Sequence, residues 1–171
     1  FERLGLPPQE LAALQLNLVR AHKAQDPGAP LPPLQTAQLV HLGLSASTLQ
    51  ALTPYISLLP LPTPVNLNTA PPEVLYACIP SLDMTGAQEL VRKRALSHFK
   101  SIADAGTLLG ERSGQINESQ HSISSRYFEV LGRLRLDQTV VQERSLVYRN
   151  GMDVQTLRRE RGAPPMPGVA R

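Results

Sequence analysis

The sequence is poor in aromatic residues and contains one cysteine and no tryptophan. Because aromatic residues make up only 4 % of the chain, a buried core has to be built from Leu, Val, Ile and Ala. Cys78 has no partner for an internal disulfide, and its apolar setting, VLYACI, is typical of a small core residue rather than of a catalytic thiol. His41, His98 and His121 stand in no recognisable catalytic context.

Long hydrophobic runs are also missing. No stretch reaches the ~18 consecutive apolar residues that a membrane-spanning helix needs, and no secretory signal peptide is present. The chain starts FERLGL, without Met, so we expect an internal part of a longer protein, and a missing anchor here says little about the whole. Proline is abundant instead: 16 residues predict short helices and strands.

Charge is distributed unevenly along the chain. Residues 1–125 contain eight Lys and Arg against nine Asp and Glu, whereas residues 126–171 contain nine Arg against five acids. A surface that binds nucleic acid is basic where it meets the phosphate backbone. The first 125 residues therefore lack the charge that such a surface requires.

Two similar stretches occur in the first third of the chain, LGLPPQELAAL at 4–14 and LGLSASTLQAL at 42–52. Each predicts a tight Gly turn followed by a short helix, and the likeness is either a structural duplication or a coincidence in a Leu-rich chain. Ser45 is the expected N-cap of the second helix. Between them, DPGAPLPP at 26–33 predicts an extended loop, after which Thr36 is placed to cap a further helix.

The stretch PVNLNTAPPEVL, residues 64–75, predicts an extended segment followed by a helix. A residue that precedes proline avoids helical geometry, so the helix is expected to begin near Pro72. Asn68 and Thr69 are expected to form a turn by bonding to nearby backbone amides. The buried side of the helix is predicted to carry Val74, Leu75, Cys78 and Ile79.

A second helix is predicted to start near residues 83–85, where Thr85 and Gln88 have the spacing of a capping box. The basic triplet at 92–94 is expected to be solvated near the end of this helix, with phosphate contact as the alternative. The inward side of the helix is predicted to carry Ala87, Leu90 and Val91.

Residues 112–125 form a polar segment without aromatic residues and are predicted to be a loop. After them the hydrophobic period becomes alternating, and Asp137–Gln138 and Asn150–Gly151 predict hairpin turns. One face is predicted to carry Phe128, Val130, Leu134 and Leu136, and the other mostly Tyr127, Glu129, Arg133 and Arg135. Residues 126–161 are thus predicted to be an antiparallel meander with one Arg-rich face, followed by a disordered tail at 162–171.

The layout of residues 64–91 is shared with helix-hairpin-helix modules that bind DNA. Those modules use a turn of the form PGIGxxxA, whose backbone N–H groups approach a phosphate closely. The corresponding stretch here, PSLDMTGA at 80–87, has Ser81 and Asp83 in place of the two glycines. The side chains obstruct the approach, and Asp83 would present a negative charge to the phosphate. We therefore predict the helical scaffold without nucleic-acid binding.

The sequence resembles the K-type minor pseudopilins of bacterial type II secretion systems, known as general secretion pathway protein K. The matching stretches are, in order, TPYISLLP, TPVNLNTAPPEVLYACIPSLD, HFKSIADA and SSRYFEVLGRLRLDQTVVQERSLVYRNG. The last is the most specific, because DNA-binding modules lack it. The resemblance spans residues 1–161, while the hydrophobic N-terminal helix and early pilin region of the family are missing.

The resemblance implies an α+β fold in which a mainly helical domain is inserted into a pilin-like antiparallel sheet domain. The helical domain would be residues 1–111, with two SAM-like or helix-hairpin-helix-like lobes at about 1–59 and 66–111. Residues 112–125 would be a loop, and residues 126–161 the C-terminal part of the pilin sheet.

The implied role is structural and not enzymatic. Such proteins cap the tip of the pseudopilus, initiate its assembly and support protein export across the outer membrane. Their partners are the I-type and J-type minor pseudopilins and other type II secretion components. The full-length protein would be periplasmic and anchored to the bacterial inner membrane through an N-terminal helix absent from this chain.

Two other classes of function remain as alternatives: a helix-hairpin-helix DNA-binding protein of the competence type, and a hydrolase, for which the sequence gives no positive sign. Val130 and Leu134 are the candidate partner-binding residues. Calcium is a possible cofactor only through the family resemblance. The acids near the predicted turns, Asp137, Glu143 and Asp153, lack the spacing of a calcium-binding loop.

Overall fold

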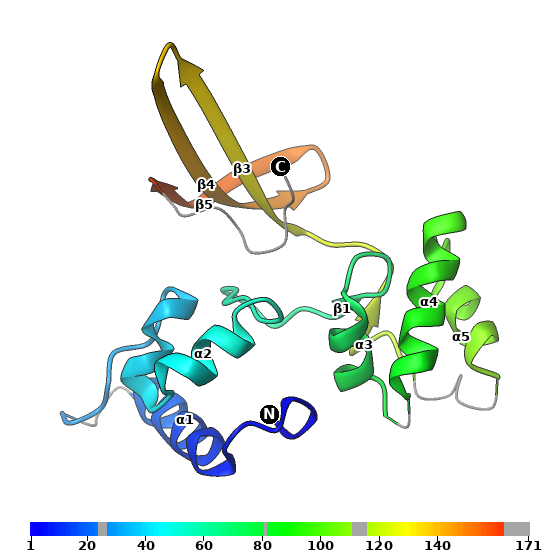
Figure 1. Cartoon of the computed structure of the whole chain (residues 1–171), viewed down its shortest axis with the longest axis horizontal. Helices are drawn as coiled ribbons and strands as arrows, with labels where there is room; N and C mark the ends of the chain where they lie inside the picture. Colours follow the sequence, from blue (N-terminus) through cyan, green and yellow to red (C-terminus); the bar gives the residue numbers. More distant parts are fainter. Residues whose placement is uncertain (24–26, 81, 111–115, 163–171) are drawn as a thin grey trace. The chain divides into compact units, whose positions relative to one another are not determined.

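The computed structural model describes residues 1–23, 27–80, 82–110 and 116–162. Two compact units are present: Phe1–Thr63 with Pro71–Glu89, and Pro64–Ala70 with Leu90–Arg171. Figure 1 shows helices along most of the chain and a three-stranded antiparallel sheet near its C-terminal end. The predicted α+β class is therefore confirmed. The tail predicted at 162–171 lies outside the described residues except for Gly162.

Short helical elements form the N-terminal part of the first unit. They are the 3-10 helix η1 (Glu2–Leu4), α1 (Pro8–Ala21), the 3-10 helix η2 (Thr36–Leu42) and α2 (Ala46–Leu52). The cluster buried among them consists of Leu39, Leu42, Leu44 and Leu52, against which Leu14, Leu18 and Leu49 pack. As the shortage of aromatic residues predicts, this core is aliphatic.

The two similar sequence stretches have the same local structure. Gly5 and Gly43 adopt left-handed backbone conformations, with φ of 62° and 106°, shortly before α1 and α2. Gly43 also lies close to Ala13 of α1, because a Cβ added at position 43 would be 2.8 Å from the Cβ of Ala13. Ser45 caps α2 as predicted by accepting the N–H of Thr48 at 3.2 Å.

Glu10 of α1 reaches the start of α2. Its carboxylate accepts the backbone N–H of Ser45 at 2.9 Å and the Ser45 hydroxyl at 3.2 Å. The backbone bond is the main reason why the pKa of Glu10 lies below its ordinary value. The predicted cap at Thr36 is wrong: Thr36 is already the first residue of η2, and Gln35 with Gln38 forms the capping box.

Helix α3 (Pro72–Cys78) begins where the prolines predict, with Ala70 and Pro71 outside it. Leu75 and Ile79 are completely buried, whereas Cys78 is exposed, which contradicts its predicted place in the core. Leu75 and Ile79 are four residues apart and therefore lie on the same, buried side of the helix. Cys78, at the last helical position, turns away from it.

Helix α4 (Met84–Leu96) carries Ala87 and Leu90 as buried residues, as predicted, with Val91 only half-buried. The helix starts within the predicted range, but the residue whose side chain bonds to its first turn is Asp83 and not Thr85. The Oδ1 atom of Asp83 accepts the backbone N–H of Gly86 at 2.7 Å. A Cβ on Gly86 would lie 2.8 Å from Leu82 Cδ1, so a larger residue here would require Leu82 to move.

The second unit contains a short parallel strand pair and helix α5 (Ile102–Leu109). Strand β1 (Val65–Asn66) pairs with β2 (His121–Ser122), which lies inside the segment predicted to be a loop. A capping box begins α5: Asp104 Oδ2 accepts the N–H of Ser101 at 3.0 Å, and the Ser101 hydroxyl accepts the N–H of Asp104 at 3.2 Å.

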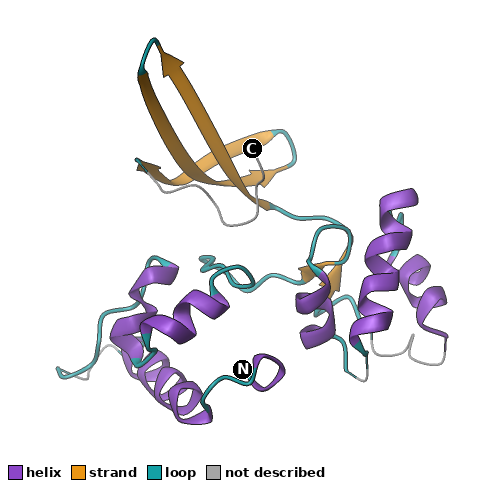
Figure 2. Ribbon diagram, in the orientation of Figure 1, coloured by secondary structure: helices purple, strands orange, loops and turns teal. Residues whose placement is uncertain are grey.

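The C-terminal sheet has the strand order β3–β4–β5 (Figure 2). Strands β3 (Tyr127–Leu136) and β4 (Thr139–Asn150) are joined by the predicted Asp137–Gln138 turn, in which Asp137 has a φ of 51°. Strand β5 (Asp153–Arg161) follows a turn at Gly151–Met152, because Asn150 already pairs with Asp153. The second hairpin is thus confirmed, with its turn one residue later than predicted.

Candidate interaction surface

Asn68 is the centre of a hydrogen-bond network within the second unit. Its amide nitrogen donates to the carbonyl oxygens of Phe99 at 3.0 Å and Ile123 at 3.1 Å. Its amide oxygen accepts the N–H of Phe99 at 2.9 Å. The side chain therefore links the residues just after β1 to two segments that are 31 and 55 residues away in the sequence. Asn68 was expected only to stabilise a local turn, and its reach is longer.

Two neighbours of Asn68 extend this network. The local turn bond is made by Asn66, whose Oδ1 accepts the N–H of Asn68 at 2.9 Å, while Asn66 Nδ2 donates to Ser125 at 2.9 Å. Arg94 donates to the carbonyl of Leu67 at 2.7 Å, and partial burial lowers its pKa. Arg94 was predicted to be solvated or to contact phosphate, and it is instead committed to the protein backbone.

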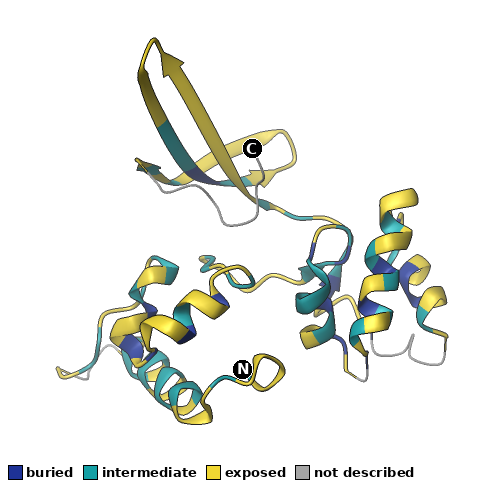
Figure 3. Ribbon diagram, viewed as in Figure 1, coloured by how far each residue is buried: buried dark blue, intermediate teal, exposed yellow. Residues whose placement is uncertain are grey.

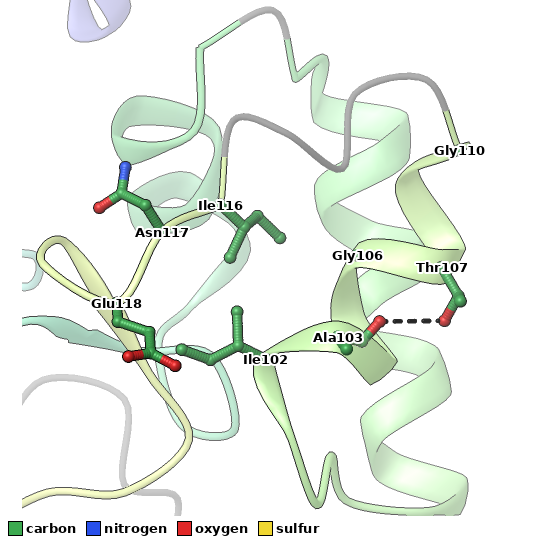
Figure 4. Close-up of a pocket in the computed structure, with 8 residues that line it drawn as sticks. All are labelled: Ile102, Ala103, Gly106, Thr107, Gly110, Ile116, Asn117 and Glu118. Atoms are coloured by element: carbon green, nitrogen blue, oxygen red, sulfur yellow. Dashed lines mark hydrogen bonds between the residues drawn. The ribbon is translucent and has the colours of Figure 1, made fainter.

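A pocket of about 690 Å³ lies between α5 and the residues before β2 (Figure 4). Ile102, Gly106 and Ile116 give it an apolar lining. Thr107 also lines the pocket, and its hydroxyl group donates hydrogen bonds to the carbonyls of Ala103 and Asp104. These groups do not form a catalytic constellation of nucleophile and base.

The hairpin between α3 and α4 does not offer a phosphate site. The Asp83 carboxylate accepts the N–H of Gly86, in the first turn of α4. A phosphate at this position would have to displace that carboxylate and would be repelled by its charge. The geometry therefore supports the prediction that the helical scaffold is present without the DNA-binding turn.

The C-terminal sheet exposes an apolar face. We use the term apolar face for Phe128, Val130, Leu134, Leu136 and Val141. Residues opposite each other in an antiparallel pair point to the same face, so the pairing of Leu134 with Val141 places both strands' side chains there. Val130 and Leu134, the predicted partner-binding residues, are 50 % and 70 % exposed. Figure 3 shows that most of the β3–β4 hairpin is exposed.

The opposite side of the sheet is the basic face, defined by Arg133, Arg135 and Arg144. It is less uniform than the alternation predicts, because Leu131 and Val140 share it and are 40 % and 42 % exposed. Tyr127 and Tyr148 form an aromatic pair on the same side, with ring centroids 5.0 Å apart. Arginines also occur on the apolar side near β5, where Glu143 pairs with Arg159 and Arg161.

The acids considered for calcium do not converge. Asp137 and Asp153 lie beside the turns at opposite ends of β4. Glu143 lies between them and pairs with Arg159 at 3.1 Å and Arg161 at 3.3 Å. Within the described ranges, no group of three or more His, Cys, Asp and Glu residues is arranged to hold a metal ion. These three residues therefore do not fit a calcium site.

Comparison with known proteins identifies a related family. The family model described as "Type II secretion system (T2SS), protein K" matches residues 65–124, which include Asn68 and both residues to which its side chain bonds. The chain resembles type II secretion system protein K. The protein of that name from Pseudomonas aeruginosa is 29 % identical over 135 residues, which are 77 % of this chain and 39 % of the relative.

These findings confirm the resemblance seen in the sequence and link the chain to a type II secretion component. They do not favour the DNA-binding alternative. Along the described ranges, none of the helices has both the length and the apolar character needed to cross a bilayer.

Sequence patterns did not reveal the part that two residues of the matched segment take in the fold. Arg94 belongs to a basic triplet that looks solvated, and His121 lies in a polar stretch yet is only 1 % exposed. Strand β2 has two residues, too few for any alternation to be visible. The one available signal was the concentration of Asn residues at 66–68, which have both donors and acceptors to satisfy distant backbone groups.

Proposed function

We propose that this chain is the helical and C-terminal sheet part of a K-type minor pseudopilin, a structural subunit at the tip of the type II secretion pseudopilus. The observation that carries the proposal is the family match at residues 65–124. The hydrogen bonds of Asn68 to Phe99 and Ile123 lie inside the matched segment and join its beginning to two of its later parts.

The exposed sheet supports the pilin-like part of the proposal. Three strands with large apolar residues in contact with water are unfavourable as an isolated domain. Among the described strands, β3 pairs with β4 alone, so no described strand covers its other edge. The relative is much longer than the matched stretch, so other segments of such a protein are available to cover the apolar face. We infer that an N-terminal pilin helix of the same protein packs there.

In this proposal the complete protein is periplasmic and anchored to the inner membrane by that helix. It assembles with the I-type and J-type minor pseudopilins, initiates the pseudopilus and supports export across the outer membrane. The helical domain faces outward and blocks addition of subunits above it. None of these steps requires catalysis.

The experiment introduces Val130→Asp and Leu134→Asp into the full-length protein, with the I-type and J-type subunits of the same organism as partners. Charges on the apolar face should prevent the helix from packing there. The double variant should therefore fail to form the ternary complex in size-exclusion chromatography and fail to support secretion.

Leu31→Asp with Leu34→Asp is the matched control, since these leucines are 87 % and 73 % exposed and lie in the proline-rich loop. This control should assemble normally. Circular dichroism should show the helical content of both variants unchanged. A normal ternary complex of the Val130→Asp/Leu134→Asp variant would rule out the proposed role of the apolar face.

A further inference from the structure

Within the part of the chain that the structure describes, which ends at residue 162, the β3–β4 hairpin extends beyond its pairing with β5. The last described pair is Glu143–Arg161, and the Gly162 N–H then donates to the Gln142 carbonyl at 2.8 Å. Residues 133–142 continue beyond this point as two strands, from the pair Arg133–Gln142 to the pair Leu136–Thr139. We call this segment the hairpin arm. Figure 1 shows it projecting past β5.

The two sides of the hairpin arm have different chemistry. Leu134, Leu136 and Val141 lie on the apolar face, whereas Arg133 and Arg135 lie on the basic face. The only acid in the arm is Asp137 in the turn, whose carbonyl accepts the Nε–H of Arg135 at 3.0 Å. Both arginines are exposed, and a guanidinium group has five N–H donors, so the bond from Arg135 to Asp137 leaves further donors on its side chain. The basic side of the arm thus concentrates positive charge.

The composition of this side fits a protein partner better than a polyanion. The cations that define this face, Arg133, Arg135 and Arg144, are all arginines, and residues 126–161 contain no lysine. Arg is enriched and Lys depleted in protein–protein interfaces, because the planar guanidinium binds carboxylates in a bidentate manner. The exposed Val140 beside Arg135 adds apolar area, which contributes to a protein interface and not to phosphate contacts.

We propose that the basic face of the hairpin arm docks on a carboxylate-bearing surface of a neighbouring protein subunit. The inference rests on the proposed function, in which the protein's own N-terminal helix covers the apolar face and leaves the basic face outward. An arm of only two strands is marginally stable in water, so a subunit on this side also stabilises the arm. Arg133 and Arg135 provide the charge complementarity.

The test measures affinity of the full-length protein for the I-type and J-type subunits of the same organism, with Arg133→Glu/Arg135→Glu as the variant. Reversing two interfacial charges should weaken binding by at least about tenfold and reduce its dependence on salt. Arg133→Lys/Arg135→Lys keeps the charge and should bind with intermediate affinity. Lys23→Glu/Lys93→Glu makes the same change in net charge on exposed residues elsewhere and should bind normally.

The outcomes separate this inference from the function on which it rests. If the unchanged protein binds the two subunits and the Arg133→Glu/Arg135→Glu variant binds equally well, the arm inference is wrong and the proposed function stands. If the unchanged protein does not bind them at all, both are wrong. Loss of binding to phosphatidylglycerol vesicles in this variant, with subunit binding intact, would assign the arginines to a membrane and also overturn the inference.

Discussion

Replacement of Asn68 with Ala should destabilise the second unit by about 2–4 kcal/mol. The change removes three hydrogen bonds, two donated by Nδ2 and one accepted by Oδ1. A typical bond contributes roughly 0.5–1.5 kcal/mol net, and backbone groups left unsatisfied in a part-buried site add to the loss. The affected groups are the N–H and carbonyl of Phe99 and the carbonyl of Ile123.

Urea denaturation followed by circular dichroism measures the change in free energy of unfolding. The N–H of Phe99 should also exchange with deuterium faster, because its acceptor is gone. Asn17→Ala is the matched control: the Asn17 side chain donates a hydrogen bond to the Leu42 carbonyl at 3.0 Å, and its loss should cost no more than about 1.5 kcal/mol. An Asn68→Ala variant as stable as the unchanged chain would refute the role given to this side chain.

Three further results are expected. Leu75→Ala and Leu90→Ala should each lower the free energy of unfolding by about 2–5 kcal/mol, since both side chains are almost completely buried; unchanged urea midpoints would show that the buried faces are misassigned. Hydrogen bonds from the Ser101 side chain and from the Lys100 and Ser101 backbones lower the pKa of Asp104 from 3.8. The capping box therefore stabilises α5 above that pH and loses this contribution as the pH falls below it. In thermal melts, the Asp104→Asn variant should lack this part of the acid dependence. The chain should not bind duplex DNA specifically, and a salt-dependent micromolar affinity in fluorescence anisotropy that Asp83→Lys leaves unchanged would contradict this.

Much of the fold could be predicted from local patterns. Pro72, Ser45 and the Ser101–Asp104 pair mark helix starts through bonds within a few residues, and the two turns of the C-terminal sheet follow from Asp137–Gln138 and Asn150–Gly151. These features depend on neighbours in the sequence. Alternation likewise predicted the two faces of β3.

Long-range contacts account for what the sequence did not predict. The pairing of β1 with β2 joins residues more than fifty positions apart. Arg94 donates a hydrogen bond to the carbonyl of Leu67 and is not fully solvated. Cys78 lies in an apolar run, and its exposure depends on how α3 is rotated, which is decided by the burial of Leu75 and Ile79. The apolar face could be predicted from the alternation along one strand. The hairpin arm could not, because its length depends on where the pairing of β4 with β5 ends.

Secretion in living cells tests the proposed function most directly. In a type II secreting bacterium whose gene for this protein is deleted, the secreted enzymes are assayed in the culture medium and in the periplasm. The proposal predicts that they accumulate in the periplasm, that the full-length gene restores export, and that the Val130→Asp/Leu134→Asp gene does not. Normal export from the deletion strain would contradict the assignment of this chain to the secretion machinery.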